Sequence, residues 1–316
     1  MDFLFSPLEQ SDISLLPPLE AVGGKGYGLY WLAAHGFPAP PTWVVSTLAF
    51  DRTLQRMGLQ KRIAELEETL LAARGEWTVI QRRLETLEPL RQEITSSIRQ
   101  APLLDRVGQA LEKLTLMPTQ WAIRSSATAE DSPDHSFAGQ FLSLLSVPQG
   151  ATIWDAIRQV WASTFGRKAL SYCAQNKIPI PRMAVILQPM APITEQDRSG
   201  VIFSHSPVES IPGVLIQAAF GTGETVVKGY GGDLYSVQGN VVKVHPMPPA
   251  HIQVTAPDGY TAPVEPPSTS PLTEDEARHL ADLALQVSSR WAGPVNIEFV
   301  WRAGEGPLLV QVRSAR

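Results

Sequence analysis

The chain has 316 residues, of which 44% are hydrophobic and 18% are charged, and its formal net charge is −5. A chain of this length buries a large core and is expected to form two domains or one two-lobed domain. The mildly acidic balance argues against nucleic acid as the main partner, although a nucleotide needs only a few cations and backbone amides. One cysteine, Cys173, excludes a disulfide framework and favours a cytoplasmic location. No secretory signal and no apolar run of membrane-spanning length is found, so no membrane partner is expected.

In chain order, a helix is predicted over residues 26–35, ended by Gly36 and by a proline soon after, and a strand over 43–47. Residues 51–116 then place apolar side chains at steps of three or four, which predicts a helical subdomain. Gly75 and Pro89 are expected to divide it into several helices. A coiled-coil partner site is a weaker alternative, because the repeat is short and interrupted.

After residue 117 the pattern changes to alternation, which predicts strands. One long amphipathic helix is expected over residues 151–175, and a capping box of Thr273 and Glu276 predicts the start of another. The proline-rich segment 246–272 is interpreted as a surface excursion. We therefore divide the chain into an N-terminal lobe, 1–195, which carries the helical subdomain, and a C-terminal lobe, 196–316.

The stretch "AVGGKGYG" combines close-approach glycines with a lysine just before a helix. Gly23 and Gly24 let a backbone lie against a ligand, Lys25 brings a positive charge, and a helix start offers amide donors. This arrangement suits phosphate oxygens, but it is not a Walker A loop, since no Ser or Thr follows Lys25. A glycine-rich turn with an exposed lysine explains this stretch equally well.

The stretch "WAIRSSATAEDSPDHSFAGQ" begins as a buried strand and continues as a polar loop. Arg124 lies at the strand end, and its planar guanidinium can grip phosphate at two points. The hydroxyls and small residues that follow suit a backbone lying against a ligand. The alternative is a polar turn in which Arg124 pairs with Glu130 or Asp131.

The C-terminal stretch "VNIEFVWRAGEGPLLVQVRSAR" predicts a hairpin of two strands. Alternation places Asn296 and Glu298 on one face of the first strand, and Gln311 and Arg313 on one face of the second. A carboxylate with amide oxygens is a hard ligand set suited to Mg²⁺. The alternative is a polar sheet face open to water.

A fourth stretch, "GTGETVVKGYGGDLYSV", carries five glycines, at positions 221, 223, 229, 231 and 232. So many glycines predict a loop that approaches another backbone or a ligand closely. A plain glycine-rich hairpin is almost as good an explanation.

Together and in this order, these stretches resemble the nucleotide-binding domain of the phosphoenolpyruvate synthase and pyruvate phosphate dikinase family, which also occurs in rifampin phosphotransferases. The resemblance implies an α+β fold of the ATP-grasp type, in which two lobes hold the nucleotide between them. It implies that Lys25 and Arg124 contact ATP phosphates. Gly139 and Ser143 would line the nucleotide pocket, and Gln188 would contact the adenine or ribose side.

The same resemblance implies a role for the C-terminal hairpin. Glu298 and Gln311 would hold Mg²⁺, and Arg313 would reach a phosphate, so that Lys25, Arg124 and Arg313 form the catalytic group. Asn296 stands where the family commonly has an aspartate, which removes one negative charge beside the metal site.

The resemblance implies an ATP-dependent phosphotransferase that cleaves Mg-ATP and passes a phosphoryl group to a histidine. None of the six histidines lies in the threonine-x-histidine loop expected of a phosphohistidine carrier, so the carrier is expected to be a separate domain or protein. Two alternatives remain: a non-catalytic regulatory or scaffold protein that binds nucleotide, and a stand-alone ATP-grasp kinase or ligase acting on a small acceptor.

Overall fold

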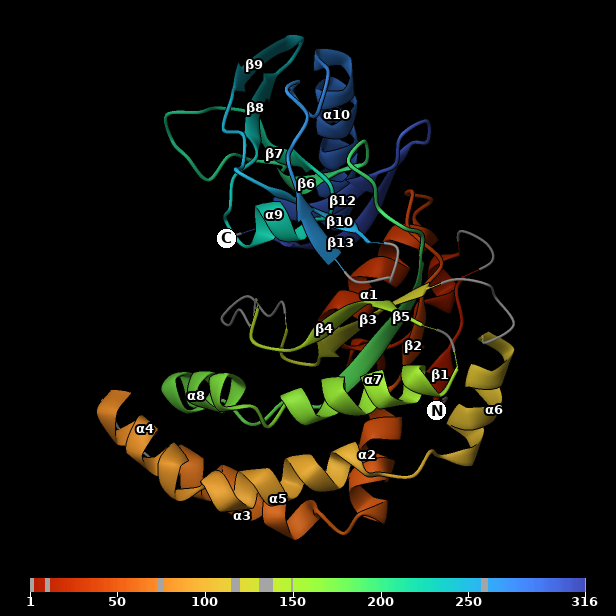
Figure 1. Cartoon of the computed structure of the whole chain (residues 1–316), viewed down its shortest axis with the longest axis vertical. Helices are drawn as coiled ribbons and strands as arrows, with labels where there is room; N and C mark the ends of the chain where they lie inside the picture. The colour runs from red at the N-terminus through yellow and green to blue at the C-terminus, as the bar shows by residue number, and fades with distance from the viewer. Residues whose placement is uncertain are drawn as a thin grey trace. The chain divides into compact units, whose positions relative to one another are not determined.

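The computed structural model describes residues 3–8, 12–72, 77–114, 120–130, 139–148, 150–256 and 261–315. The chain divides into two compact units, whose elements are labelled in Figure 1. Unit 1 comprises Met1–Pro7, Pro17–Tyr27 and Pro41–Met190, and unit 2 comprises Leu8–Leu16, Gly28–Pro40 and Ala191–Arg316. The longest part of unit 1 thus ends at Met190, near the lobe boundary expected at residue 195. Gly28–Pro40, assigned to the first lobe from sequence, belongs to unit 2 instead.

Unit 1 is built on a five-stranded sheet in which every neighbouring pair is antiparallel. In spatial order, the strands are β1 (Leu4–Phe5), β2 (Trp43–Val45), β5 (Met183–Met190), β3 (Gln120–Ala127) and β4 (Ser143–Val147). Strands β3 and β5 are buried along nearly their whole length, and β5 has the almost continuous apolar sequence that such burial favours.

Helices cover this sheet in layers. Those that lie wholly in unit 1 are α2 (Thr47–Arg56), α3 (Gln60–Leu71), α4 (Trp77–Thr86), α5 (Glu88–Arg99), α6 (Asp105–Leu114), α7 (Ala151–Ser163) and α8 (Arg167–Asn176). Helix α7 packs on β3, β4 and β5, α5 packs on α7, and α3 packs on α5 (Figure 1). The expected helical subdomain at 51–116 is therefore present as α3–α6 with most of α2.

Residues 151–175 form two helices rather than the single long helix expected from their periodicity. Helix α7 ends at Ser163, and Gly166, in an extended conformation, is the N-cap of α8. The apolar stripe continues across the break, because Trp154, Trp161 and Phe165 are all buried in the core of unit 1. Periodicity reports the buried face, and it does not detect a break that leaves that face in register.

Pro89 separates α4 from α5 as expected, and it does so from the first turn of α5. At that position its missing N–H removes no helical hydrogen bond. The other expected break, Gly75, lies outside the described residues.

The same first turn of α5 holds an ion pair. The Arg91 guanidinium donates two hydrogen bonds to the Glu88 carboxylate, and these hold the pKa of Glu88 at about 2.

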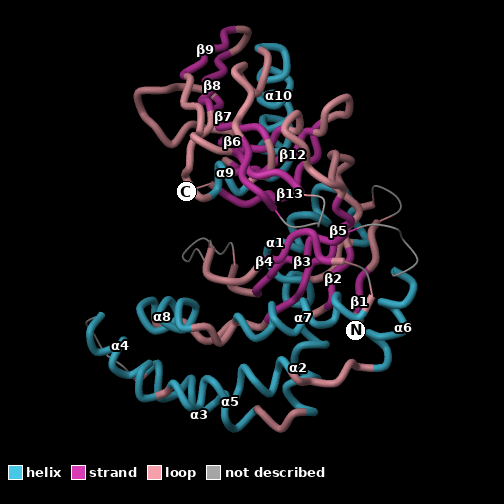
Figure 2. The backbone as a smooth tube through the Cα atoms, in the orientation of Figure 1, coloured by secondary structure: helices cyan, strands magenta, loops and turns pink. Residues whose placement is uncertain are grey.

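Unit 2 contains a six-stranded antiparallel sheet and a two-stranded one. The larger sheet has the order β13 (Pro307–Ser314), β12 (Val295–Trp301), β6 (Arg198–Phe203), β7 (Val214–Phe220), β8 (Asp233–Gln238) and β9 (Val241–His245). Its helical elements are η1 (Ile13–Leu15), the part of α1 (Leu19–Ala34) from Gly28 onward, α9 (Glu224–Val227) and α10 (Glu274–Trp291). Helix α10 packs along the sheet against β6, β7, β8 and β12 (Figure 2).

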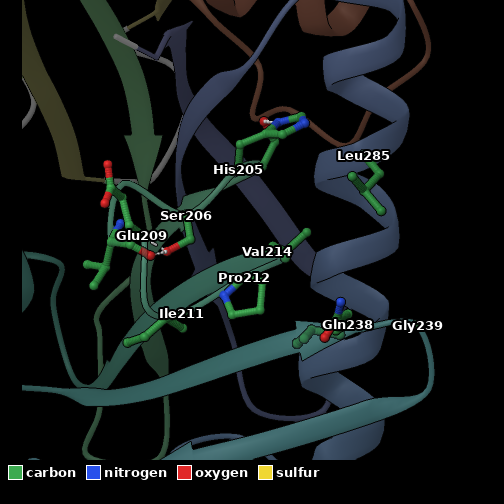
Figure 3. A pocket seen from close by; sticks show the side chains of 13 residues that line it. His205, Ser206, Glu209, Ile211, Pro212, Val214, Gln238, Gly239 and Leu285 are labelled. Carbon is green, nitrogen blue, oxygen red and sulfur yellow. Dashed lines mark hydrogen bonds between the residues drawn. The ribbon is translucent and has the colours of Figure 1, made fainter.

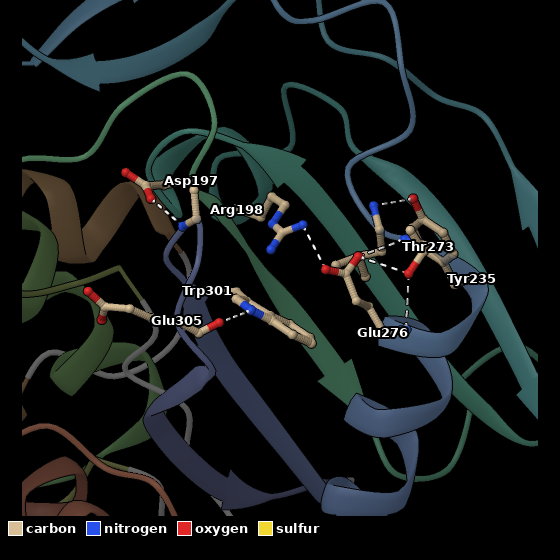
Figure 4. A network of polar contacts seen from close by, with 9 residues as sticks. Asp197, Arg198, Tyr235, Thr273, Glu276, Trp301 and Glu305 are labelled. Atoms are coloured by element: carbon tan, nitrogen blue, oxygen red, sulfur yellow. Dashed lines mark hydrogen bonds and ion pairs between the residues drawn. The ribbon is translucent and has the colours of Figure 1, made fainter.

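The predicted capping box at the start of α10 is confirmed. The Thr273 hydroxyl accepts from the Glu276 N–H, and the Glu276 carboxylate accepts from the Thr273 N–H. Glu276 also pairs with Arg198 at 2.9 Å, and the Arg198 guanidinium lies 5.2 Å from the ring centre of Trp301 (Figure 4). This network fastens the beginning of β6 to the first turn of α10.

The segment 246–272 is more ordered than the expected surface excursion. It contains a hairpin of β10 (Ile252–Thr255) and β11 (Thr261–Val264), and both Ile252 and Val254 are buried. Among the described residues of this segment, Pro263 lies on β11, and the other prolines lie outside the two strands, where a missing N–H costs no ladder hydrogen bond. Among the helices that the structure describes, none has the length and apolar character needed to cross a membrane.

Candidate functional site

The start of helix α1 (Leu19–Ala34) is kinked and lies against the end of β3. Gly23 breaks the helical conformation with φ +72° and ψ 174°. A Cβ atom added at Gly23 would lie 2.1 Å from the backbone oxygen of Ser126, so only glycine fits there. The Ser126 hydroxyl accepts from the Gly26 N–H at 2.9 Å and donates to the Val22 carbonyl at 2.7 Å. The predicted close approach at Gly23 is thus an approach to the chain's own backbone.

Lys25 lies within this fastened segment, and its charge is paired. Its Nζ is 2.5 Å from Glu130 Oε1, and the other oxygen of Glu130 accepts from the Ala127 N–H at 3.1 Å. The Lys25 side chain is 14% exposed and that of Glu130 is 2% exposed. The alternative of an exposed lysine on a plain turn is therefore wrong. Sequence reasoning had named Glu130 only as a partner for Arg124.

Arg124 lies on β3 between two neighbouring strands. Its Cα pairs with that of Ser143 on β4 and that of Ile186 on β5. Its guanidinium reaches Gln188 Oε1 at 3.5 Å, and the Gln188 amide donates to the Thr42 hydroxyl at 2.9 Å. Glu130, one of its two expected acidic partners, bonds Lys25 instead, and the other, Asp131, lies outside the described residues.

The two remaining candidates of unit 1 are exposed. Ser143 begins β4, and Gly139 lies before it with φ +65° and accepts from the Lys168 ammonium at 2.7 Å. Strand β3 and its two neighbours therefore bring Arg124, Ser143 and Gln188 into adjacent positions. Thr42, which orients Gln188, was missed from sequence, and nothing in its local pattern signalled the contact.

In unit 2, the hairpin of β12 and β13 forms with the predicted convergence. Asn296 lies opposite Arg313, and Glu298 lies opposite Gln311. Gln311 is buried, and the other three side chains are half-buried, so this is not a polar face fully open to water. The register shifts after Glu298, which leaves Val310 without an opposite residue.

That shift also affects burial among the apolar residues of the hairpin. Ile297, Phe299 and Val312 are buried, whereas Val310 is only half-buried. A bulged residue loses its place in the alternation, which periodicity by itself does not detect.

The oxygens at this hairpin fit a hard cation. Glu298 offers a carboxylate and Gln311 an amide oxygen from directly opposite positions, and such ligands suit Mg²⁺ when phosphate and water complete its shell. In the described part of the chain, no group of three or more His, Cys, Asp or Glu side chains is placed so that it could hold a metal ion. The arrangement therefore suits a cation brought with a phosphate ligand, and not a closed protein cage.

The glycine-rich loop after β7 approaches another backbone, as expected from its composition. At Gly221 the φ angle is +79°, and an added Cβ would lie 2.3 Å from the Gln253 carbonyl oxygen. That same carbonyl accepts from the Thr222 N–H at 2.8 Å. Gly221 therefore allows this loop to pack closely against β10.

Unit 2 also has an open cavity of about 360 Å³ beside the loop between β6 and β7 (Figure 3). Its lining includes His205, Glu209, Ile211 and Gln238, with Leu285 of α10 at its edge. None of the candidate site residues named above lines it. The His205 ring lies 3.2 Å from the Ser204 hydroxyl.

Three curated proteins illustrate what the chain is similar to. It is 28% identical over 312 residues to a probable phosphoenolpyruvate synthase of Methanothermobacter thermautotrophicus, covering 95% of this chain and 44% of that protein. It is 28% identical over 346 residues to the phosphoenolpyruvate synthase of Aeropyrum pernix, covering 97% and 41%. It is 30% identical over 292 residues to the rifampicin phosphotransferase of Streptomyces sviceus, covering 88% and 32%. The chain thus spans less than half the length of each of these relatives.

Among solved structures, the ADP complex of N5-carboxyaminoimidazole ribonucleotide synthetase aligns with 74% of this chain and 51% of its own. The identity is 12% and the TM-score is 0.26, which is too low to establish a shared fold.

The family described as pyruvate phosphate dikinase, AMP/ATP-binding domain, matches residues 19–316. This region includes the glycine–lysine segment, Arg124 on β3 and the β12–β13 hairpin. Because the match covers nearly all of the sequence, the chain belongs to the pyruvate phosphate dikinase AMP/ATP-binding domain family.

Proposed function

We propose that this chain is the nucleotide-binding part of a phosphotransferase, which cleaves Mg-ATP and passes a phosphoryl group to a histidine on a separate carrier domain or protein. The observation that carries this proposal is the fastened segment around Lys25 in a chain of an AMP/ATP-binding family. A lysine held beside a helix start combines a positive charge with backbone amides, which is a suitable environment for phosphate.

In unit 1, Lys25 and Arg124 would bind the ATP phosphates. Arg124 offers a planar fork of donors, and Lys25 offers a compact charge. Gln188, which is oriented by Thr42, would contact the adenine or ribose, and Gly139 and Ser143 would line the pocket. The adjacent positions of Arg124, Ser143 and Gln188 on three neighbouring strands support this assignment.

In unit 2, Glu298 and Gln311 would hold Mg²⁺, and Arg313 would reach a phosphate oxygen. Magnesium supplies charge neutralisation at the phosphates when it is bound. What the protein contributes is the opposite placement of Glu298 and Gln311 on paired strands, with Arg313 two residues further on.

We infer an ATP-grasp arrangement, in which the residues of both units act on one nucleotide. The support is the order of the motifs along the chain and the family match over residues 19–316. The cytoplasm is the proposed location, since the single cysteine is buried in a chain without a disulfide.

The first expected result concerns binding. Lys25→Ala and Arg124→Ala should each weaken Mg-ATP binding by about 1 to 3 kcal/mol, the usual scale for losing a charged hydrogen-bond partner. Isothermal titration calorimetry measures the effect, and Lys61→Ala, on the exposed face of α3, is the control. Wild-type protein that does not bind ATP would overturn the proposed function.

The second expected result concerns transfer. Incubation with ATP labelled in the β or the γ phosphate, together with a histidine-bearing carrier domain from a related phosphotransferase, should label the carrier in acid-labile form. The position of the label identifies which phosphate is transferred. Binding without any label on carrier, water or small acceptor would favour the non-catalytic alternative, and release of labelled phosphate to a small acceptor would favour a stand-alone kinase or ligase.

A further inference from the structure

Glu130 is a nearly fully buried carboxylate whose two oxygens both accept hydrogen bonds. Oε1 accepts from the Lys25 ammonium at 2.5 Å, and Oε2 accepts from the Ala127 N–H at 3.1 Å. A buried carboxylate is costly unless it is paired and hydrogen-bonded, and here both conditions are met. Through Ala127, the carboxylate is tied to the last residue of β3.

The ion pair is not required to attach the start of α1 to β3. The Ser126 hydroxyl already binds both Gly26 and Val22, and Gly23 packs directly on the Ser126 backbone. The backbone of Lys25 is therefore positioned without help from Glu130. Without Glu130, the Lys25 side chain would still be free to change rotamer. Ordering such a side chain costs up to about 2 kcal/mol of conformational free energy.

We propose that Glu130 is a positioning residue, which holds the Lys25 ammonium at one fixed point so that its remaining N–H donors meet phosphate. This inference rests on the proposed function, because it concerns how Lys25 performs its role there. Holding the ammonium before the nucleotide arrives means that binding does not have to order it.

A competing effect has the opposite sign. A carboxylate close to a phosphate site repels the ligand and partly neutralises Lys25, so its removal would tighten ATP binding. The tie to Ala127 favours the positioning role, because the second oxygen of Glu130 is directed toward β3 by that bond. The direction of the change in affinity decides between the two effects.

Glutamine is the sharpest substitution at this position. Both oxygens of Glu130 accept hydrogen bonds, whereas a glutamine side chain has one oxygen and one NH2 group. Glu130→Gln therefore loses one of the two hydrogen bonds, and its NH2 group faces either the Lys25 ammonium or the Ala127 N–H. Glu130→Asp keeps both oxygens but shortens the side chain by one methylene. A positioning role predicts that aspartate restores part of what glutamine loses.

The experiment is a double-mutant cycle measured by calorimetry with Mg-ATP on the full chain. Glu130→Gln should weaken ATP binding about tenfold, at the lower end of what loss of a charged hydrogen bond causes. In a Lys25→Met background, Glu130→Gln should weaken ATP binding less than about twofold, because Glu130 acts on ATP only by holding the Lys25 ammonium. Adenosine, followed by ligand-observed NMR, should bind wild type and Glu130→Gln equally.

Glu88→Gln is the matched control, because Glu88 also accepts from a basic side chain in unit 1 but lies on α5 in the helical subdomain. It should leave ATP affinity unchanged. Thermal unfolding checks that each variant folds, and if Glu130→Gln does not, Glu130→Asp carries the test.

Unchanged or tighter ATP binding by folded Glu130→Gln overturns the inference, and so does unchanged or tighter binding by Glu130→Asp where Glu130→Gln does not fold. So does an equal loss in the Lys25→Met background, or an equal loss for adenosine, since either indicates general structural damage. The proposed function fails separately, by absence of ATP binding to the wild-type chain.

Discussion

Glu298→Gln is expected to abolish ATP turnover and the dependence of ATP binding on Mg²⁺, while leaving the fold intact. Glu298 is the single carboxylate among Asn296, Glu298 and Gln311, so its replacement leaves only neutral oxygens for the cation. Phosphoryl transfer relies on metal ions to neutralise developing charge, and loss of the metal removes that contribution. Titration of ATP affinity and of phosphate release with magnesium measures both effects.

Asn296→Asp tests the same site in the opposite direction. Asn296 lies two residues before Glu298 on β12 and opposite Arg313, so an aspartate there adds a second carboxylate on the same strand face. We expect a lower magnesium requirement and faster turnover. Glu305→Gln is the control, since Glu305 is an exposed acid in the turn of the same hairpin. A Glu298→Gln protein as active as wild type would show that the metal site lies elsewhere.

Gly23→Ala is expected to cause the largest loss of stability among single substitutions near the Lys25 segment. The new Cβ would lie 2.1 Å from the Ser126 backbone oxygen, and the φ angle of +72° is itself unfavourable for alanine. Because the obstacle is backbone of a central strand, it cannot move aside cheaply. We expect a loss of about 3 kcal/mol or more in the free energy of unfolding, measured by chemical denaturation.

Gly58→Ala separates the two causes of that loss. Gly58 has a similar φ of +67°, yet nothing lies within 4 Å of an added Cβ. Its substitution should therefore cost only the conformational part, about 1 to 2 kcal/mol. Equal losses at Gly23 and Gly58 would contradict the role assigned to contact with Ser126.

The sequence by itself determined the elements whose signals are local. Strand β12 (Val295–Trp301) forms in the predicted hairpin, because the alternation of apolar and polar side chains from Val295 to Phe299 identifies a strand with one buried face. The capping box of α10 was readable for the same reason, since Thr273 and Glu276 are three residues apart. The match of motifs in a fixed order sufficed to indicate the family.

Only the tertiary structure decided which distant side chains meet. Lys25 and Glu130 are 105 residues apart, and Gln188 and Thr42 are 146 apart, so no periodic pattern connects either pair. The assignment of Gly28–Pro40 to unit 2 and the bulge at Val310 likewise depend on packing against other segments. Local sequence sets the conformation and the buried face of each element, whereas the partner of a polar side chain is set by how those elements pack, which the pattern within any one of them does not contain.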